Sequence, residues 1–390
     1  MRPVIKPESI RLWFCLIAIA VQSGTACYAL DPITLATWQG FPIRIGPYDA
    51  VNHRIQMVGY ATSCAGTASV CARLWEYANG PENPFTLGED AGVDRSGALA
   101  IDASQFPTPV YGWILDPSAP SASNAPEVWT KNPAPPPLSA HAQLLPLAGG
   151  RGGEANDINA GGMIVGSCLD AAQHKHACLW PTQNSVPQDL GTLGGLESEG
   201  WRINVAGTIV GWAQDASGAR HAFRYDYILG RNKTTIPVMR DIHPAGYTSS
   251  TGLAINDVGS IVGEVQADQG TQAGLWDAQK GFVQLPNSGA TASARGINNI
   301  GLIVGYTKVF PANGLRGVST AVFWMPALKV SPKSALYVLQ PASAFLSSGS
   351  KTVTLTGCND VNDRGDMACY GLSHDGPLSG EHAYLLLGTP

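Results

Sequence analysis

The sequence predicts an all-β fold, a β-propeller of seven four-stranded blades closed by the N-terminal strand. Three observations predict it. A short hairpin phrase recurs along the chain about every 52 residues. Two further strand-like segments follow each clear copy of the phrase, so one unit holds four strands. The last unit lacks a fourth strand, and a segment that resembles one precedes the first unit. Six or eight blades stay open, because the first two units are poorly preserved.

The hairpin phrase reads Ile-Asn-x-x-Gly-x-Ile-Val-Gly and is clearest at residues 158–166, 255–263 and 297–305. Asn at the first position of a turn and Gly at the fourth are typical of a type I turn. The Asn side chain can bond its own backbone, and Gly accepts a positive φ. The β-branched runs on both sides predict a tight β-hairpin. The expected anchors of the seven units are Asn52, Asp94, Asn159, Asn204, Asn256, Asn298 and Asn362.

A third strand is predicted where Ala-x-Leu/Phe-Trp or a variant recurs after each clear anchor. Its tryptophans are expected in the core, at Trp75, Trp180, Trp276 and Trp324. In the second unit, Trp113 and Trp129 are alternative candidates for this strand. A fourth strand is predicted to end the first six units, at residues 85–92, 142–150, 187–195, 237–246, 282–289 and 336–343.

The closure of the ring is predicted from the two ends of the repeat array. The seventh unit stops after its third strand at residues 383–386, whereas residues 32–40 resemble the fourth strand at 187–195 and precede the first anchor. An N-terminal strand that completes the last blade would leave only short, protected sheet edges. Units of this length match propeller blades and are too long for one turn of a hexapeptide β-helix.

Two segments depart from the repeat. Residues 117–137 hold seven prolines and are predicted to form an extended loop. Residues 329–352 enlarge the sixth unit.

The N-terminus has the features of a secretory signal. A basic region containing Arg2, Lys6 and Arg11 precedes a short apolar run at residues 12–21, and small residues predict cleavage after Ala29. We therefore expect a signal peptide at 1–29 and a single propeller domain at 30–390. A lipoprotein attached through Cys27 is the less favoured alternative. No later apolar run reaches 18 residues, so no transmembrane segment is expected. Periplasmic and extracellular locations are both compatible with export.

Six cysteines remain after this signal, which in an exported chain indicates disulfides. Their spacing pairs neighbours along the chain, as Cys64–Cys71, Cys168–Cys178 and Cys358–Cys369. Cys358 and Cys369 lie at equal distances from the turn that follows Asn362, so they should face each other across a hairpin. A metal site is the weaker interpretation, because no CxxC spacing occurs. We expect neither a metal nor another cofactor.

The repeats resemble those of the HAF-family extracellular repeat proteins, named for a His-Ala-Phe triplet. The triplet stands here at His221-Ala222-Phe223, with variants that begin at His176 and His382. The hairpin phrase and the sequence LGTLGG at 190–195 are also typical of that family. The resemblance covers residues 32–390 and is strongest over 154–326. It implies a secreted, blade-forming repeat protein of uncertain biochemical role, with no catalytic residues to transfer.

Composition and motifs restrict the function. The net charge of −5 argues against nucleic-acid binding, which needs a basic face. GxSxG, Walker, HExxH and helix-opening GxGxxG motifs are absent from the sequence. The sequence therefore favours a non-catalytic binding or interaction scaffold, a monomer whose protein or glycan partner is not identified. A carbohydrate-active propeller, either a lectin or a glycosidase or lyase, is the alternative, so enzymatic activity stays open.

Candidate ligand-binding residues come from positions that vary while the repeat around them does not. Two residues before the anchor, the units carry Asp157, Arg202 and Asp360, but Ala or Gly elsewhere. Trp201 and Trp212 fall outside the repeated tryptophan pattern and could stack on a sugar ring. Asp157 and Asp360 are also the acids that a glycosidase would need.

Overall fold

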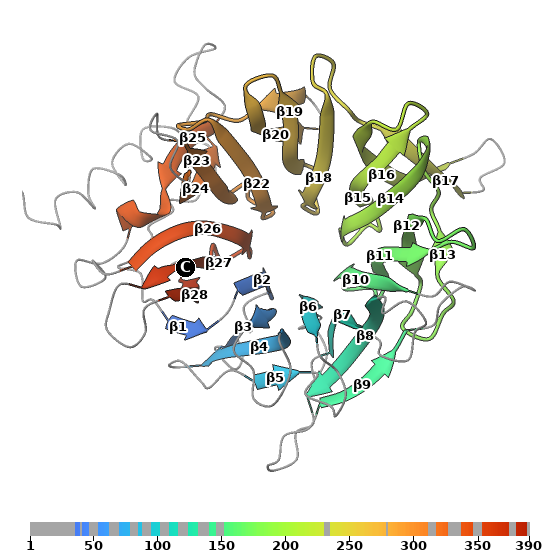
Figure 1. The fold of residues 1–390 in the computed structure, drawn as a ribbon, viewed down its shortest axis with the longest axis horizontal. Helices are drawn as coiled ribbons and strands as arrows, with labels where there is room; N and C mark the ends of the chain where they lie inside the picture. The colour runs from blue at the N-terminus through green and yellow to red at the C-terminus, as the bar shows by residue number, and fades with distance from the viewer. Residues whose placement is uncertain are drawn as a thin grey trace, which may run out of the picture.

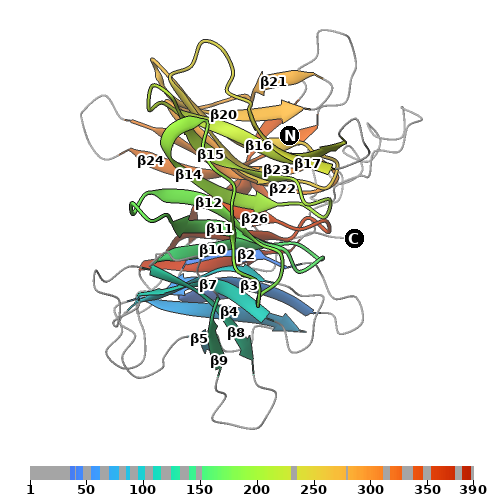
Figure 2. The same ribbon diagram turned by 90° about the vertical axis from the view of Figure 1, so that its right-hand side faces the viewer.

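The computed structural model describes residues 36–39, 41–46, 54–61, 70–78, 85–87, 95–101, 109–115, 124–131, 140–145, 152–229, 235–277, 280–310, 317–326, 337–345, 353–373 and 380–387. Seven four-stranded antiparallel sheets surround a central axis, as the sequence predicts (Figure 1). Each sheet is one blade, and the first strand of each hairpin lies innermost. Seen from the side, the sheets pack against one another around the axis (Figure 2).

The blades follow chain order. Blade 1 contains β2 (Phe41–Ile45), β3 (Arg54–Ala61), β4 (Cys71–Ala78) and β5 (Phe85–Leu87). Blade 2 contains β6 (Ser96–Ile101), β7 (Pro109–Leu115), β8 (Asn124–Lys131) and β9 (Ala140–Leu144). Blade 3 contains β10 (Gly153–Ile158), β11 (Ile164–Leu169), β12 (Lys175–Trp180) and β13 (Gln188–Asp189). Blade 4 contains β14 (Gly194–Ile203), β15 (Ile209–Asp215), β16 (Arg220–Leu229) and β17 (Thr235–Asp241).

Blade 5 contains β18 (Ser249–Ile255), β19 (Ile261–Ala267), β20 (Gly270–Asp277) and β21 (Gly281–Gln284). Blade 6 contains β22 (Thr291–Ile297), β23 (Ile303–Val309), β24 (Val318–Pro326) and β25 (Tyr337–Pro341), followed by a 3-10 turn at Ala342–Phe345. Blade 7 contains β26 (Val353–Val361), β27 (Met367–Ser373) and β28 (Gly380–Leu386), with β1 (Ala36–Gln39) as its fourth strand.

The pairing of β1 with β28 confirms the predicted closure. The two strands run antiparallel, with Thr37 opposite Tyr384 and Gln39 opposite His382. Because β1 lies at the N-terminal end and β28 near the C-terminal end, this sheet joins segments more than 300 residues apart and holds the ring closed.

The predicted tight hairpins form in the well-preserved units. The N–H of Gly162 donates to the carbonyl of Asn159, and Gly162 has a φ of 78°. The Asn159 side-chain oxygen accepts from the N–H groups of Gly161 and Met163. Only a residue with a short acceptor side chain followed by a Gly at positive φ satisfies this geometry, which explains the spacing of the phrase.

The first two units differ from the prediction. In blade 1, Gly46 takes the anchor position, because its N–H donates to the carbonyl of Gln56 at the end of the inner hairpin; Asn52 lies outside the described residues. In blade 2, the placement of the anchor at Asp94 is wrong. The inner strand β6 begins after it, and the connection to β7 spans residues 102–108. This longer connection lacks the Asn-Gly spacing on which the prediction relied.

The Pro-rich segment 117–137 is not a loop throughout, which corrects the prediction. Its middle forms β8, the third strand of blade 2, which pairs with both β7 and β9. Trp129, rather than Trp113, is therefore the third-strand tryptophan of that blade and is fully buried. One of the seven prolines, Pro126, lies in the strand, opposite Trp113 of β7, and its carbonyl accepts the N–H of Leu145.

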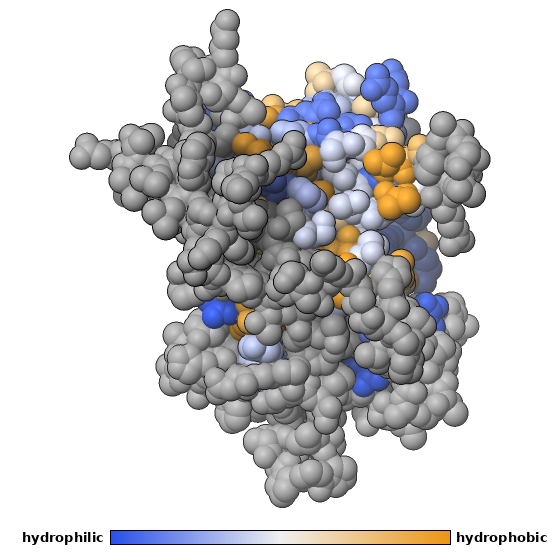
Figure 3. All heavy atoms as spheres, turned by 90° about the vertical axis from the view of Figure 1, so that its left-hand side faces the viewer, coloured by the Kyte–Doolittle hydropathy of each residue, from blue (hydrophilic) through white to orange (hydrophobic). Residues whose placement is uncertain are grey.

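The repeated tryptophans form the core, as predicted. Trp75, Trp180 and Trp324 are fully buried, and Trp276 is nearly so. The indole N–H of Trp324 donates to the carbonyl of Pro286 at 2.7 Å, which ties blade 6 to blade 5. Over the described part of the surface drawn in Figure 3, apolar and polar residues intermingle. The hydrophobic clusters join residues of adjacent blades, so the apolar burial is concentrated between neighbouring blades.

Two predicted disulfides are present. Cys168–Cys178 joins β11 to β12, with Cα atoms 5.8 Å apart, and Cys358–Cys369 joins β26 to β27, with Cα atoms 3.9 Å apart. Cys358 and Cys369 are opposite each other in the sheet register, as the turn symmetry predicts. Cys64 lies outside the described residues, so its pairing with Cys71 stays a prediction. Residues 1–29 also lie outside them.

Among the described residues, the structure has no helix long and apolar enough to cross a membrane.

Candidate ligand-binding channel

The anchor asparagines link neighbouring blades as well as forming the turns. Each side-chain N–H₂ group donates to the anchor carbonyl of the next blade. These bonds run from Asn159 to Asn204 (3.0 Å), Asn204 to Asn256 (3.2 Å), Asn256 to Asn298 (3.0 Å), Asn298 to Asn362 (2.9 Å) and Asn362 to Gly46 (3.2 Å). We call these five asparagines the asparagine ring. The sequence indicates only their role in the turns, since the second partner belongs to another blade.

Replacing one ring member should destabilise the propeller measurably. Asn256→Ala removes the turn acceptor and the donor to blade 6, and leaves the buried carbonyl of Asn298 without that partner. We expect a loss of about 1–3 kcal/mol in the free energy of unfolding, measured by urea denaturation. Asn287→Ala is the control, because the Asn287 amide bonds within blade 5 rather than across to blade 6. A loss no larger than that of the control would contradict the inter-blade role.

The asparagine ring surrounds a cavity of about 530 Å³ at one end of the central channel, here called the channel mouth. One aliphatic residue from each blade lines its wall, namely Ile45, Ile101, Ile158, Ile203, Ile255, Ile297 and Val361. Arg44 and Asp360, one residue earlier on their strands, line it as well. The mouth thus combines a polar ring, an apolar wall and charged groups, as small-molecule sites commonly do.

The residues that follow the anchors tie the rim of the mouth together. The backbone N–H of Val205 donates to Asp257 and that of Asn299 donates to Asp363. The Asn299 amide also donates to both carboxylates, at 3.0 and 2.8 Å. The two rim carboxylates therefore serve the contacts between blades 4 to 7.

Each of the seven inner strands carries a β-bulge at the same place, one residue before the varied position. The bulged residues are Ile43, Leu99, Asn156, Trp201, Leu253, Arg295 and Asn359. Bulges re-aim side chains, so two successive residues can face the interior. Asn156 reaches the carbonyl of Gly200, and Asn359 that of Pro42, each in the next blade.

The structure brings the predicted Asp157 and Asp360 together through a residue that the sequence analysis missed. Arg44 lies two residues before Gly46 and donates to Asp157 at 2.5 Å and to Asp360 at 3.2 Å. The backbone N–H groups of Ile203 and Ile45 complete the partners of these carboxylates. Arg44, Asp157, Arg202 and Asp360 form what we call the charged belt. Counting back two residues from Gly46 would have identified Arg44.

The pKa of Arg44 depends on two opposing effects, its burial and its two aspartate partners. Burial alone would lower the pKa of the Arg44 guanidinium, whereas the charges of Asp157 and Asp360 raise it above its ordinary value. Blades 1, 3 and 7 are thereby held across the channel by one cation.

Arg202 belongs to the same belt but lacks such a partner. It is 7% exposed, and its guanidinium donates to the carbonyl of Trp201 at 3.2 Å. Burial, followed by repulsion from Arg44, lowers its pKa to about 10. Its Nε has no hydrogen-bond partner among the described residues.

The two tryptophans outside the repeated pattern have different surroundings. Trp212 is 4% exposed, donates its indole N–H to Glu199 at 3.1 Å, and is covered by the Arg220 guanidinium 3.8 Å from the ring centroid. Neither face of the Trp212 indole is therefore exposed for stacking on a sugar ring. Trp201 occupies the bulge before Arg202 and is half-buried.

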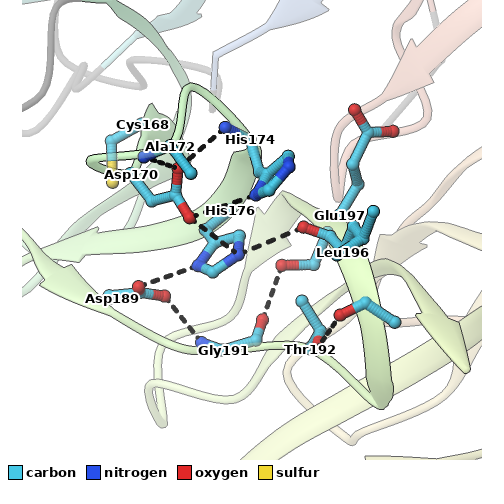
Figure 4. Close-up of polar contacts among 12 residues, drawn as sticks. Cys168, Asp170, Ala172, His174, His176, Asp189, Gly191, Thr192, Leu196 and Glu197 are labelled. Atoms are coloured by element: carbon cyan, nitrogen blue, oxygen red, sulfur yellow. Dashed lines mark hydrogen bonds and ion pairs between the residues drawn. The ribbon is translucent and has the colours of Figure 1, made fainter. Parts of the chain in front are cut away.

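The histidines of the triplets connect strands. His176 bonds Asp189 at 2.8 Å within blade 3 and the carbonyl of Leu196 at 3.2 Å in blade 4 (Figure 4). His221 bonds Asp241 at 2.7 Å in the same way. In the described part of the chain, no group of three or more His, Cys, Asp or Glu side chains is arranged to hold a metal ion.

Comparison with known proteins supports the fold and no finer assignment. No protein-family model matches the chain, and no curated protein matches it. The membership in the HAF family therefore stays a prediction. The β-propeller domain of the Trilobed protease from Pyrococcus furiosus, described as having an open velcro topology, is similar with a TM-score of 0.52 and 9% identity. The match covers 89% of this chain and 93% of that domain.

Two further solved structures have lower scores. TolB from Acinetobacter baumannii has a TM-score of 0.37 and 11% identity, over 86% of this chain and 64% of TolB. The BP39L lectin from Burkholderia pseudomallei has a TM-score of 0.39 and 11% identity, over 90% of this chain and 100% of the lectin. The match thus spans less than two thirds of TolB. At these identities, likeness indicates the propeller fold alone.

Proposed function

We propose that this protein is an exported, non-catalytic binding scaffold that holds its ligand at the channel mouth. The observation that carries the proposal is the cavity of about 530 Å³ at the meeting point of the inner strands. Its ring and wall repeat from blade to blade, whereas the charged belt beside them varies. A constant frame with varied residues inside is the expected arrangement of a binding site on a repeat scaffold.

Export is supported by the two disulfides, since such bonds persist in oxidising compartments. The expected signal at residues 1–29 points the same way. The location after export, periplasmic or extracellular, is part of the proposal and would follow from fractionation of the producing cell.

The carbohydrate-active alternative has less support. The Trp212 ring is covered on the side of Arg220 and its indole N–H is bonded. Asp157 and Asp360 bond Arg44 and backbone N–H groups, so neither is free to protonate a glycosidic oxygen. A lectin that uses the half-buried Trp201 is the form of this alternative to test.

The test is a binding screen with a variant that fills the mouth. Ala160 is exposed and lines the cavity, so Ala160→Trp should obstruct it without burying new surface. Ala216→Trp is the matched control, in the exposed turn between β15 and β16, where the chain reverses at the opposite end of the strands. A glycan array and a panel of small metabolites and peptides supply the ligands.

We expect at least one ligand of the panel to bind the wild type. Its affinity should fall at least about tenfold in Ala160→Trp, which corresponds to about 1.4 kcal/mol, and should be unchanged in Ala216→Trp. Binding that is equal in both variants would place the site elsewhere and contradict the proposal. Specific glycan binding that is lost in Trp201→Ala would instead favour the lectin.

A further inference from the structure

Three buried N–H donors of the inner strands lack an acceptor in the described part of the chain. They are Nε1 of Trp201, Nε of Arg202 and Nε of Arg295. Trp201 and Arg295 hold the bulge position in blades 4 and 6, and Arg202 follows the bulge of blade 4. Buried donors without partners are rare in folded proteins, because each costs the desolvation of its N–H group. These three require an explanation.

The carboxylates beside Arg202 bond other donors. Arg44 and backbone N–H groups already bond all four oxygens of Asp157 and Asp360. Glu199 accepts from the Trp212 indole, the Asn156 amide and Lys175. The belt thus pairs one of its two arginines with both of its aspartates.

The remaining arginine experiences mutual repulsion with other cations. Burial lowers the pKa of Arg202 most, and repulsion from Arg44 comes next. Attraction to Asp157 and Asp360 opposes this shift, and Arg295 adds a weaker repulsion.

The Arg295 guanidinium lies 5.5 Å from the Tyr306 ring centroid. Burial acts to lower the pKa of Arg295, but the charge of Glu264 and the contact with Tyr306 raise it above its ordinary value. Its Nε has no acceptor among the described residues. Among the described residues Nε of Arg202 has no acceptor either, and an oxyanion would supply one while adding negative charge beside the buried guanidinium.

We propose that the channel binds an anionic group of the phosphate or carboxylate class at Arg202. The inference rests on the proposed function and names the ligand chemistry of that site. Arg202 occupies the same strand position as Arg44 and Asp360, which line the channel mouth. Arg202 directly precedes Ile203, which lines the wall of the mouth, so the anionic end of a ligand that reaches past this wall would meet Arg202.

The experiment measures binding of two simple probes, sodium phosphate and sodium succinate, by isothermal titration calorimetry and by the shift in melting temperature. Sodium chloride at equal ionic strength is the reference. The variants are Arg202→Met, which keeps length and removes charge, and Arg220→Met, which removes an exposed cation that lies against Trp212. The Arg202 side chain bonds the backbone carbonyl of Trp201, so its replacement by an apolar side chain should not unfold the protein, and circular dichroism verifies this.

We expect at least one probe to bind saturably to the wild type, with affinity reduced more than about tenfold in Arg202→Met and unchanged in Arg220→Met. The preferred probe distinguishes a tetrahedral from a planar oxyanion. Equal binding by Arg202→Met, or no binding beyond that of chloride, would overturn the inference.

The outcomes also separate this inference from the proposed function. A panel ligand could bind Arg202→Met normally and lose affinity for Ala160→Trp. That result would keep the channel mouth as the binding site and contradict the anion site at Arg202. Phosphate or succinate binding that persists in Ala160→Trp would keep the anion site and contradict entry through the mouth.

Discussion

A chain that lacks residues 30–40 after its signal is expected to melt about 5 °C or more below the full-length protein. Without β1, the β28 edge of blade 7 loses its partner, and the buried Ala383, Tyr384 and Leu385 become accessible. At about 25 cal/mol per Å², exposure of roughly 150 Å² of apolar surface costs about 4 kcal/mol, before the unpaired backbone is counted. For a domain of about 360 residues each kcal/mol corresponds to about 1.3 °C.

A synthetic peptide of residues 30–40 provides the control. Added to the truncated chain, it should raise the melting temperature in a concentration-dependent way, because it can bind the open edge of β28. A scrambled peptide of equal composition should not. An unchanged melting temperature on truncation would mean that β1 does not hold the ring closed.

Asp157→Ala is expected to be the most damaging single substitution in the channel. It removes one of two carboxylates that neutralise Arg44 and leaves the backbone N–H of Ile203 without its acceptor. Breaking a buried pair in this way costs about 3–5 kcal/mol in the free energy of unfolding. Urea denaturation monitored by tryptophan fluorescence measures it.

Two further variants test whether the destabilisation by Asp157→Ala comes from its buried pair with Arg44. Asp189→Ala removes a carboxylate that is 52% exposed and paired with His176, so its cost should stay below about 1 kcal/mol. Arg44→Met combined with Asp157→Ala should recover part of the loss, since the two residues are directly coupled. If Asp157→Ala is no more harmful than Asp189→Ala, the belt does not bind blades 1, 3 and 7 together.

Sequence reasoning succeeds where a single local geometry demands particular residues. Asn159, Asn256 and Asn298 predict their hairpins because a turn with a side-chain acceptor and a Gly at positive φ admits few alternatives. The disulfide between Cys358 and Cys369 follows from the same kind of turn, since the register of a tight hairpin is fixed by its loop. Blade 2 has a longer connection, so that signal is lost and the assignment of Asp94 fails.

The contacts of the candidate site are harder to predict from the sequence, because they join residues that lie far apart along the chain. Asp157 and Asp360 stand out as charges in a varied position, but the residue that joins them is Arg44, 316 positions before Asp360. Its identity depends on ring closure and on Gly46 as the anchor of blade 1. The burial of Trp212 is equally beyond the sequence, since Glu199 and Arg220, which contact it, lie on two neighbouring strands.

The asparagine ring has a direction, because every amide donates to the blade that comes next in the chain. Blades 4 to 7 each accept such a bond on one side and donate one on the other. A unit that is duplicated or lost between them would meet the same donor and the same acceptor at its borders. The borders between these blades are therefore interchangeable with respect to this hydrogen bond, so duplication of one such unit would leave every amide with an acceptor.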